Sequence, residues 1–207
     1  MFERLTMADK YRNFADLERH EQPGITYRIA LRRAQTPFAI VAPHGGGIEA
    51  GTSEIADAVA GLTHSFYTFE GLKTDGNTEL HITSTRFDEP TCVTLIGVSD
   101  VVVTIHGEHS DDEGEGVFMG GLDSTRGDRI AAVLTREGFD VRTHANPNLQ
   151  GREACNLCNR GLAAAGVQLE LSKAVRRTMF DSLTREGRTH TTARFDVFVN
   201  ALREALG

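Results

Sequence analysis

A histidine and a carboxylate stand five residues apart on a glycine-rich stretch of this chain. His44 and Glu49 follow residues 38–41, an apolar run that is typical of a buried strand. Open α/β sheets place their chemistry beyond the carboxyl ends of their strands. Imidazole and carboxylate are also common ligands of catalytic zinc. The pair therefore indicates a metal site at the end of a strand, although two side chains with only structural hydrogen bonds would give the same pattern.

Two further apolar runs, 100–107 and 166–172, carry groups of the same chemical types. His106 stands near the end of the first run and Glu170 lies within the second. Parallel strands bring such ends together without closeness in sequence. A histidine at a strand end is often only a hydrogen-bonded structural residue, and a carboxylate in an alternating strand can face solvent. In a central strand, however, a buried carboxylate is costly unless it is paired or functional.

Four side chains together would make a catalytic zinc site. His44, Glu49 and His106 would supply three ligands, and such a site keeps a fourth position open for water. Glu170 would be the unliganded carboxylate that takes a proton from that water.

The glycines of these segments, at 45–47 and at Gly107, are either turn formers or positions where the backbone approaches a ligand closely. In the second case, the loop at 45–47 would lie flat against an extended, charged chain while its histidine and glutamate turn inwards to the metal.

The elements that must position these groups alternate between strands and helices along 207 residues. This order predicts a single α/β domain over residues 1–207, with a twisted, mostly parallel (mixed) sheet and helices on both faces. Strands are expected at 25–31, 38–43, 64–69, 79–84, 100–107, 117–119, 139–143 and 166–172. Helical segments are expected at 53–59, capped by Thr52 or Ser53, and at 88–96, 124–137, about 155–165 and 191–206, with a charged helix or turn at 8–21.

Composition and charge narrow the function classes. A net charge of −7 argues against broad binding of nucleic acid or of an anionic membrane. No apolar run approaches the roughly 20 residues of a membrane span, and the N-terminus lacks the apolar core of a secretory signal. Three cysteines make no disulfide framework. We therefore expect a monomer that is cytoplasmic as synthesised.

Seven short segments, in one order over most of the chain, are similar to those of a known family. The chain resembles the poly-γ-glutamate hydrolases of phages and bacteria, a small zinc-dependent family related in fold to zinc carboxypeptidases. The matching segments are 9–14, 43–53, 80–84, 87–90, 105–107, 156–160 and 166–172.

The resemblance implies one Zn²⁺ per chain, bound by His44, Glu49 and His106, with Glu170 as the base that activates the zinc-bound water. It implies cleavage of the amide that links glutamates through their side-chain carboxyls, in poly-γ-glutamate or another γ-glutamyl substrate. Carboxypeptidases space the first two ligands as His-x-x-Glu, whereas this chain puts four residues between them. The local ligand geometry should therefore differ. Release by cell lysis would fit a phage-type enzyme.

A polyanionic substrate requires cationic groups near the metal. Arg160, next to Asn159 in a family segment, is the first candidate, followed by Arg152 and Arg86. The planar guanidinium group suits carboxylate recognition. Each of these arginines could instead face solvent, and the acidic run that follows His106 is unfavourable for a polyanion.

Other signals leave alternatives open. His81 could line the cleft, support a ligand or be structural, and His109 could compete as a ligand. The pair Cys155 and Cys158 has the C-x-x-C spacing but no second pair to complete a zinc site. A zinc carboxypeptidase or deacylase acting on a small N-acyl amino acid or peptide is the alternative enzyme. A non-catalytic module that binds a polyanion or a metal is the alternative outside enzymes.

Overall fold

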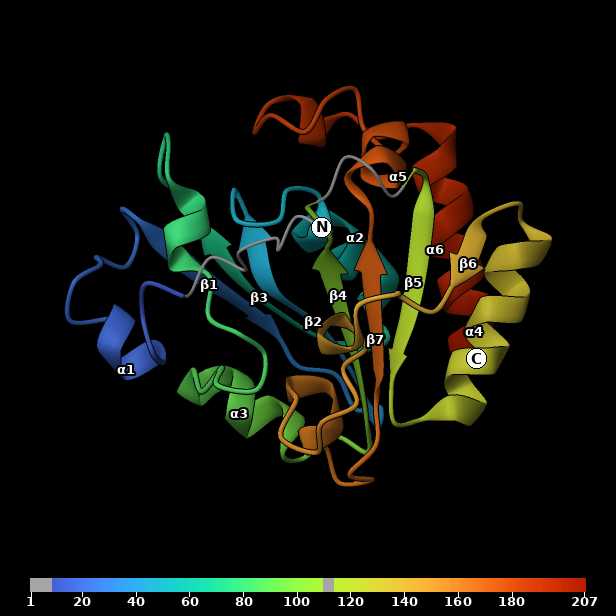
Figure 1. Ribbon diagram of the computed structural model, residues 1–207, viewed down its shortest axis with the longest axis horizontal. Coiled ribbons are helices and arrows are strands. Elements are labelled where there is room, and N and C mark those ends of the chain that lie inside the picture. Colours follow the sequence, from blue (N-terminus) through green and yellow to red (C-terminus); the bar gives the residue numbers. More distant parts are fainter. Residues whose placement is uncertain (1–8, 110–113) are drawn as a thin grey trace.

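A seven-stranded mixed sheet forms the centre of the structure, in the order β1-β3-β2-β4-β7-β5-β6 (Figure 1). This computed structural model describes residues 9–109 and 114–207. Neighbours among β3, β2, β4 and β7 are parallel, while β1 and β5 run antiparallel to them. The predicted mostly parallel, mixed sheet is confirmed. Its strands are β1 (Tyr27–Arg32), β2 (Phe38–Gly46), β3 (Ser65–Gly71), β4 (Val101–Gly107), β5 (Gly116–Gly121), β6 (Asp140–Arg142) and β7 (Val167–Leu171).

Helices cover both faces of this sheet, as predicted. On one face, α2 (Thr52–Ala60), α4 (Ser124–Arg136) and α6 (Ala193–Leu206) enclose a first core that includes Ile40, Leu134, Phe198 and Leu202. On the other face, α1 (Phe14–Leu17) and α3 (Pro90–Ile96) close a second core with Leu17, Val41, Tyr67 and Leu95. The remaining helical segments are α5 (Lys173–Thr178) and the 3₁₀ turns η1 (Asn77–Leu80), η2 (Pro147–Leu149), η3 (Leu157–Arg160) and η4 (Gly187–Thr189). In the described part of the chain, no helix has both the length and the apolar character that a membrane crossing requires.

Strand alternation carries polar groups onto the face of the second core. In β4, Val101, Val103 and Ile105 enter the first core, whereas Val102 enters the second. Because successive side chains point to opposite faces, His106 lies on the same face as Val102. The same alternation in β7 puts Glu170 on that face, and His106 pairs with Glu170 in the parallel register.

The expected strand at 79–84 is wrong. This segment is the end of η1 followed by an extended loop. It alternates because Leu80 and Ile82 are buried in the second core, while Asp9 binds His81 and the backbone N–H of Thr83. A buried loop with one apolar face therefore gives the pattern of a strand.

The expected helix at about 155–165 is also wrong, since only η3 is helical there. Asn156 Oδ1 accepts from the backbone N–H of Cys158, and Asn159 Oδ1 accepts from Leu122 and Gly166. These side chains satisfy backbone groups that a longer helix would otherwise pair.

The other expected elements are found, with changes at some ends. In residues 9–21, the described part of the charged segment, α1 is the only helix. Helix α2 begins after Gly51, which has no side-chain cap bond. Thr52 and Ser53 do not cap α2. Thr52 Oγ1 donates to the Glu49 carbonyl, and Ser53 Oγ accepts from the Gly46 N–H, so both hydroxyls fasten the preceding loop instead.

A buried arginine ties together the carboxyl ends of three parallel strands. Arg176 of α5 donates from Nε to the carbonyl of Leu171, at the end of β7 (3.1 Å). Its Nη1 donates to Ala50 beyond β2 (2.7 Å), and its Nη2 donates to Glu108 beyond β4 (2.7 Å). A Cβ on Gly107 would lie 2.7 Å from Arg176 Cζ. The close approach expected at this glycine is therefore to the protein's own guanidinium group.

Gly107→Ala should lower the free energy of unfolding by about 1–3 kcal/mol, because the guanidinium group must move away from buried carbonyls that it satisfies. Gly127→Ala is the matched control. Gly127 lies inside α4 with no atom outside its own helix backbone within 4 Å of an added Cβ. Alanine at this position should therefore raise the free energy of unfolding by about 0.5–1 kcal/mol. Urea unfolding measures both variants. Equal stability of Gly107→Ala and the wild type would contradict a rigid arrangement of Arg176 on the three carbonyls.

Candidate metal centre

The loop after β2 folds back so that His44 and Glu49 face each other. The Glu49 N–H donates to the His44 carbonyl (2.8 Å), which closes a tight turn. The turn brings His44 Nδ1 to 2.9 Å from Glu49 Oε1, and both side chains are buried. The spacing of five residues thus produces a direct pair.

The glycines of this loop serve internal packing. Gly46 has φ +63°, and a Cβ there would lie 2.6 Å from the Gly71 carbonyl oxygen. A Cβ on Gly45 would lie 2.0 Å from Ser53 Oγ. The protein's own atoms thus account for these two glycines, and the expectation that the loop lies flat against an extended chain stays a prediction.

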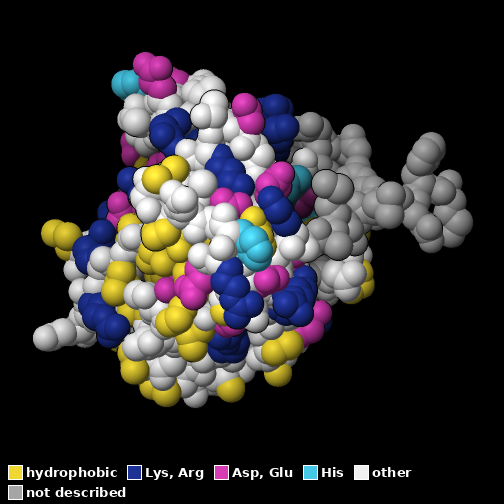
Figure 2. All heavy atoms as spheres, turned by 90° about the vertical axis from the view of Figure 1, so that its left-hand side faces the viewer, with side chains coloured by type: hydrophobic (Ala, Val, Ile, Leu, Met, Phe, Trp, Pro, Cys, Tyr) yellow, Lys and Arg dark blue, Asp and Glu magenta, His cyan; other side chains and the backbone are white. Residues whose placement is uncertain are grey.

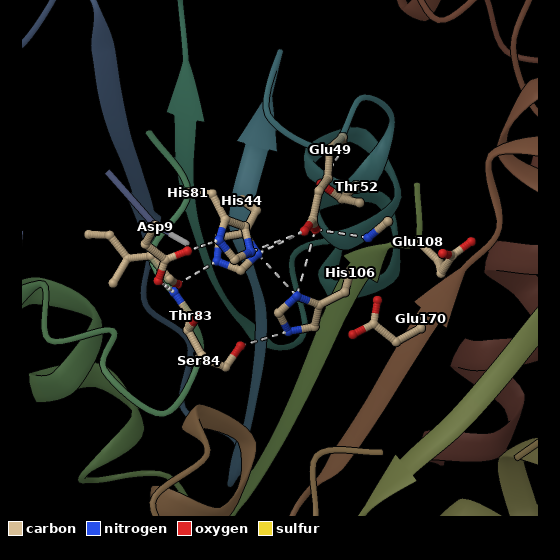
Figure 3. Close-up of polar contacts among 12 residues, drawn as sticks. Asp9, His44, Glu49, Thr52, His81, Thr83, Ser84, His106, Glu108 and Glu170 are labelled. Atoms are coloured by element: carbon tan, nitrogen blue, oxygen red, sulfur yellow. Dashed lines mark hydrogen bonds and ion pairs between the residues drawn. The ribbon is translucent and has the colours of Figure 1, made fainter. Parts of the chain in front are cut away.

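His106 completes a cluster of three buried donors (Figure 3). Its Nδ1 lies 3.2 Å from His44 Nδ1 and 3.6 Å from Glu49 Oε2. The Gly107 N–H donates to the same Glu49 oxygen (2.8 Å), which holds the carboxylate in place. Among the described residues these three offer ligand atoms within 4.8 Å of one another.

The hydrogen bonds around the cluster direct its acceptors inwards. His44 Nε2 faces the Ile82 carbonyl (2.8 Å), so this nitrogen carries the proton and donates. In the neutral ring, Nδ1 is then a lone pair aimed at Glu49 and His106. Although burial raises the pKa of Glu49, His44 and His106 hold it well below its usual range. Without a metal, a proton must occupy the space between these acceptors, and a metal ion would replace that proton.

The spacing of the donors also fits zinc. Two ligand atoms at about 2.0–2.1 Å from a tetrahedral zinc lie about 3.3 Å apart. The three pairs in the cluster measure 2.9, 3.2 and 3.6 Å, with Glu49 contributing a different oxygen to each histidine. The bond from His44 Nε2 to a carbonyl is the kind of contact that orients a metal-binding imidazole. The residues present therefore fit a zinc ion.

Glu170 lies beside His106 with its carboxyl group on the same face of the sheet (Figure 3). It is buried, and Gln168 Nε2 donates to its Oε1 (3.0 Å). Burial raises the pKa of Glu170 well above its usual value, and the negative charges of Glu49 and Glu108 add to this. A raised pKa suits a group that accepts and returns a proton near neutral pH.

The expected arginines differ in whether their contacts link them to the metal ligands. Arg86 Nη2 donates to Asp9 Oδ2 (2.5 Å), and Asp9 in turn binds His81 next to His44. Arg160 Nη1 donates to the Phe87 carbonyl (2.5 Å). Asn159 and Arg152 are not brought to the metal ligands by any contact within the described residues. Of the three expected arginines, Arg86 is therefore the one that a chain of contacts connects to the centre.

The loop that precedes β7 holds the last two expected substrate residues. Asn159 is buried, and its Nδ2 donates to the carbonyls of Gly151 and Glu153. Arg152 is exposed, and no described residue pairs with its side chain. Neighbouring Gly151 packs on Gln168, since a Cβ there would lie 2.6 Å from Gln168 Oε1. The substrate-binding roles of Arg152, Asn159 and Arg160 stay predictions.

Basic and acidic side chains are mixed on the face that carries β1 and α1, as Figure 2 shows. Recognition of an anion must therefore come from particular groups and not from a uniformly positive surface. His109 is exposed and lies outside the cluster of ligand atoms. Part of the acidic run that follows it, 110–113, lies outside the described residues.

Sequence reasoning missed three polar residues around the centre. Asp9 holds His81, Gln168 holds Glu170, and Arg176 holds the strand ends. The only signal for Asp9 and Gln168 was their position in segments that resemble the family. Arg176 had no signal, because it stands among other basic residues of a short helix. The C-x-x-C pair is split between an exposed Cys155 and a buried Cys158, whose pKa burial raises to about 12.

Glu170→Gln should change how the stability of the metal-free protein depends on pH. The raised pKa of Glu170 means that the native state favours the protonated carboxyl group. The stability that this group contributes is complete below its pKa in the unfolded chain, and it is lost as pH rises through its pKa in the native state. Glutamine cannot ionise, so the variant should lose less stability between about pH 5 and about pH 8. Thermal unfolding in a chelator measures this. Glu153→Gln, an exposed control, should follow the wild type. Parallel curves for Glu170→Gln and the wild type would contradict the raised pKa.

Known proteins resemble this chain along most of its length. The family described as poly-gamma-glutamate hydrolase matches residues 11–201. The SPβ prophage-derived protein YoqZ of Bacillus subtilis (strain 168) is 40% identical over 185 residues, which cover 89% of this chain and 66% of YoqZ. The chain thus spans about two thirds of that relative. YndL of the same bacterium is 34% identical over 184 residues, or 88% of this chain and 71% of YndL.

Two solved structures share the fold and are closely similar. The structure of a bacteriophage poly-γ-glutamate hydrolase has a TM-score of 0.91 at 35% identity, and the match covers 96% of each chain. A zinc-free structure of YndL has a TM-score of 0.89 at 33% identity, covering 96% of this chain and 97% of the other. With the match over residues 11–201, these likenesses show that the chain belongs to the poly-γ-glutamate hydrolase family.

Proposed function

We propose that this protein is a zinc-dependent hydrolase that cleaves the γ-glutamyl amide bonds of poly-γ-glutamate. One observation carries the proposal: the buried ligand atoms of His44, Glu49 and His106 converge at strand ends, with the carboxyl group of Glu170 beside them. Membership of the family supports the substrate. The expectations of a monomer and of release by lysis stay predictions.

His44, Glu49 and His106 would hold the metal, and the chain's other groups would prepare the reaction. A bound zinc ion supplies a Lewis acid that polarises a carbonyl and lowers the pKa of water. Glu170 would accept the proton of the attacking water and return it to the nitrogen of the leaving amine. Gln168 Nε2 binds Glu170 Oε1, which leaves the other carboxyl oxygen for that proton.

His106→Ala should bring the zinc content well below one ion per chain, because it removes one of three convergent donors. His44→Ala should do the same. His190→Ala is the matched control, since His190 is exposed in the loop after η4 and should leave the zinc content unchanged. Metal analysis after dialysis measures all three variants. A wild-type zinc content in His106→Ala would remove this residue from the ligand set.

The zinc-loaded protein should shorten long poly-γ-glutamate into oligomers, which gel filtration of the products would measure. Glu170→Gln should lower turnover by at least about a hundredfold while zinc stays near one per chain, because the proton acceptor is lost. Glu153→Gln should retain full activity.

Each alternative function predicts a different result in this assay. Release of single terminal residues would favour a carboxypeptidase. Cleavage of a small N-acyl amino acid with an intact polymer would favour a deacylase. Binding of the polymer without any hydrolysis by the wild type would favour a non-catalytic module and overturn the proposal.

A further inference from the structure

A polar unit flanks the metal centre on the side away from Glu170 (Figure 3). His81 lies against His44, with ring centroids 4.0 Å apart. Its Nε2 is 3.8 Å from Glu49 Oε1, which is too long for a hydrogen bond. The side chain is 33% exposed, so the ring reaches solvent at the edge of the centre.

Asp9 fixes the orientation of this histidine. Its Oδ1 lies 2.7 Å from His81 Nδ1, and its side chain is only 4% exposed. Although burial raises the pKa of Asp9, hydrogen bonds from His81 and Thr83 hold it well below its usual range. The ionised carboxylate can only accept, so the proton of the neutral imidazole is on Nδ1. Nε2 is then an acceptor at the edge of the metal centre, on the side of Glu49.

The second oxygen of Asp9 fixes a cation next to this acceptor. Oδ2 accepts from Arg86 Nη2 (2.5 Å) and from the Thr83 N–H (2.7 Å). The Arg86 side chain is 47% exposed, and its other N–H groups bind no described residue. One carboxylate thus places a hydrogen-bond acceptor and a guanidinium group side by side.

The repeat of a γ-linked glutamate chain has the complementary pair of groups. On the leaving side of each amide, one α-carbon carries both the amide N–H and a free carboxylate. An acceptor next to a guanidinium group matches this donor next to a carboxylate.

We propose that Asp9 is a positioning residue that holds His81 and Arg86 as a single recognition unit for the leaving-side glutamate. His81 Nε2 accepts from the amide N–H at the cleaved bond, and Arg86 binds the carboxylate on the same α-carbon. This inference rests on the proposed function and extends it to three residues outside the ligand set.

The test compares variants of the zinc-loaded protein on poly-γ-glutamate. Asp9→Asn, Arg86→Ala and His81→Asn should each lower kcat/KM by about tenfold to a hundredfold, since each removes one charged or buried hydrogen bond. Zinc should stay near one per chain. The double variant Asp9→Asn with Arg86→Ala should lose little more than either single variant, because the two residues act together.

Matched controls come from the same N-terminal segment. Asp16 lies in α1 and accepts hydrogen bonds from Arg12, which precedes this helix. Neither residue contacts the centre. Asp16→Asn and Arg12→Ala should keep the kcat/KM of the wild type. A second measurement uses the Glu170→Gln variant to follow binding without cleavage. Adding Arg86→Ala to this variant should weaken its affinity for a γ-glutamyl oligomer. The same substitution should leave the affinity unchanged for an oligomer whose leaving-side carboxylates are amidated.

The outcomes separate this inference from the proposed function. If the wild type hydrolyses the polymer but Asp9→Asn only lowers the melting temperature, with kcat/KM unchanged, Asp9 is purely structural and the inference fails. Loss of zinc from Asp9→Asn would also overturn it, because Asp9 would then support the metal ligands. An inactive wild type would refute the proposed function instead.

Discussion

Three acceptor groups share one buried space, and the rest of the structure is arranged around that constraint. His44 Nδ1, the Glu49 carboxylate and His106 Nδ1 are within hydrogen-bonding or ion-pair distance of one another. Without a metal, at least one ring N–H must lie between these acceptors, because an unpaired lone pair or negative charge is costly in a buried space of low polarity. Strand pairing and the tight turn after β2 prevent the groups from moving apart. The fold therefore holds three potential ligand atoms together around a space that a proton or a metal ion can fill.

The sheet and most of its helices were predictable because burial imposes a simple period on the sequence. β4 and β7 are buried along their whole length, and apolar residues dominate the first while they alternate with Gln168 and Glu170 in the second. The same reasoning failed at 79–84, where an extended loop buries alternate side chains without joining the sheet. It failed again at 155–165, where asparagine side chains replace helical hydrogen bonds. Periodicity reports which side chains are buried, and it does not report which backbone groups pair.

The centre itself was predictable in part, since parallel strands deliver their ends to one edge and the residue types at those ends are visible. The contacts of Asp9 and Arg176 were not predictable, because their partners are distant in sequence. Asp9 was marked only by its place in a segment that resembles the family, and Arg176 by no pattern. Asp9 reaches residues 72 to 77 positions away, and Arg176 reaches a carbonyl 126 positions away. Only the tertiary structure identifies such contacts. They position other side chains and backbone groups, and they produce no periodic pattern in the sequence.

Charge around the centre explains how an acidic site can serve an acidic polymer. Burial lowers the pKa of Arg176, and the nearby carboxyl groups of Glu49, Glu170 and Glu108 oppose this shift in part. The guanidinium group of Arg176 donates to backbone carbonyls, so its charge offsets the carboxylates while these donors do not bind an anion. A divalent cation among the ligands would offset the remaining negative charge around the reacting bond. Under the proposed function, a bound metal and Arg86 would supply the attraction for the polymer, which makes the overall charge of −7 compatible with a polyanionic substrate.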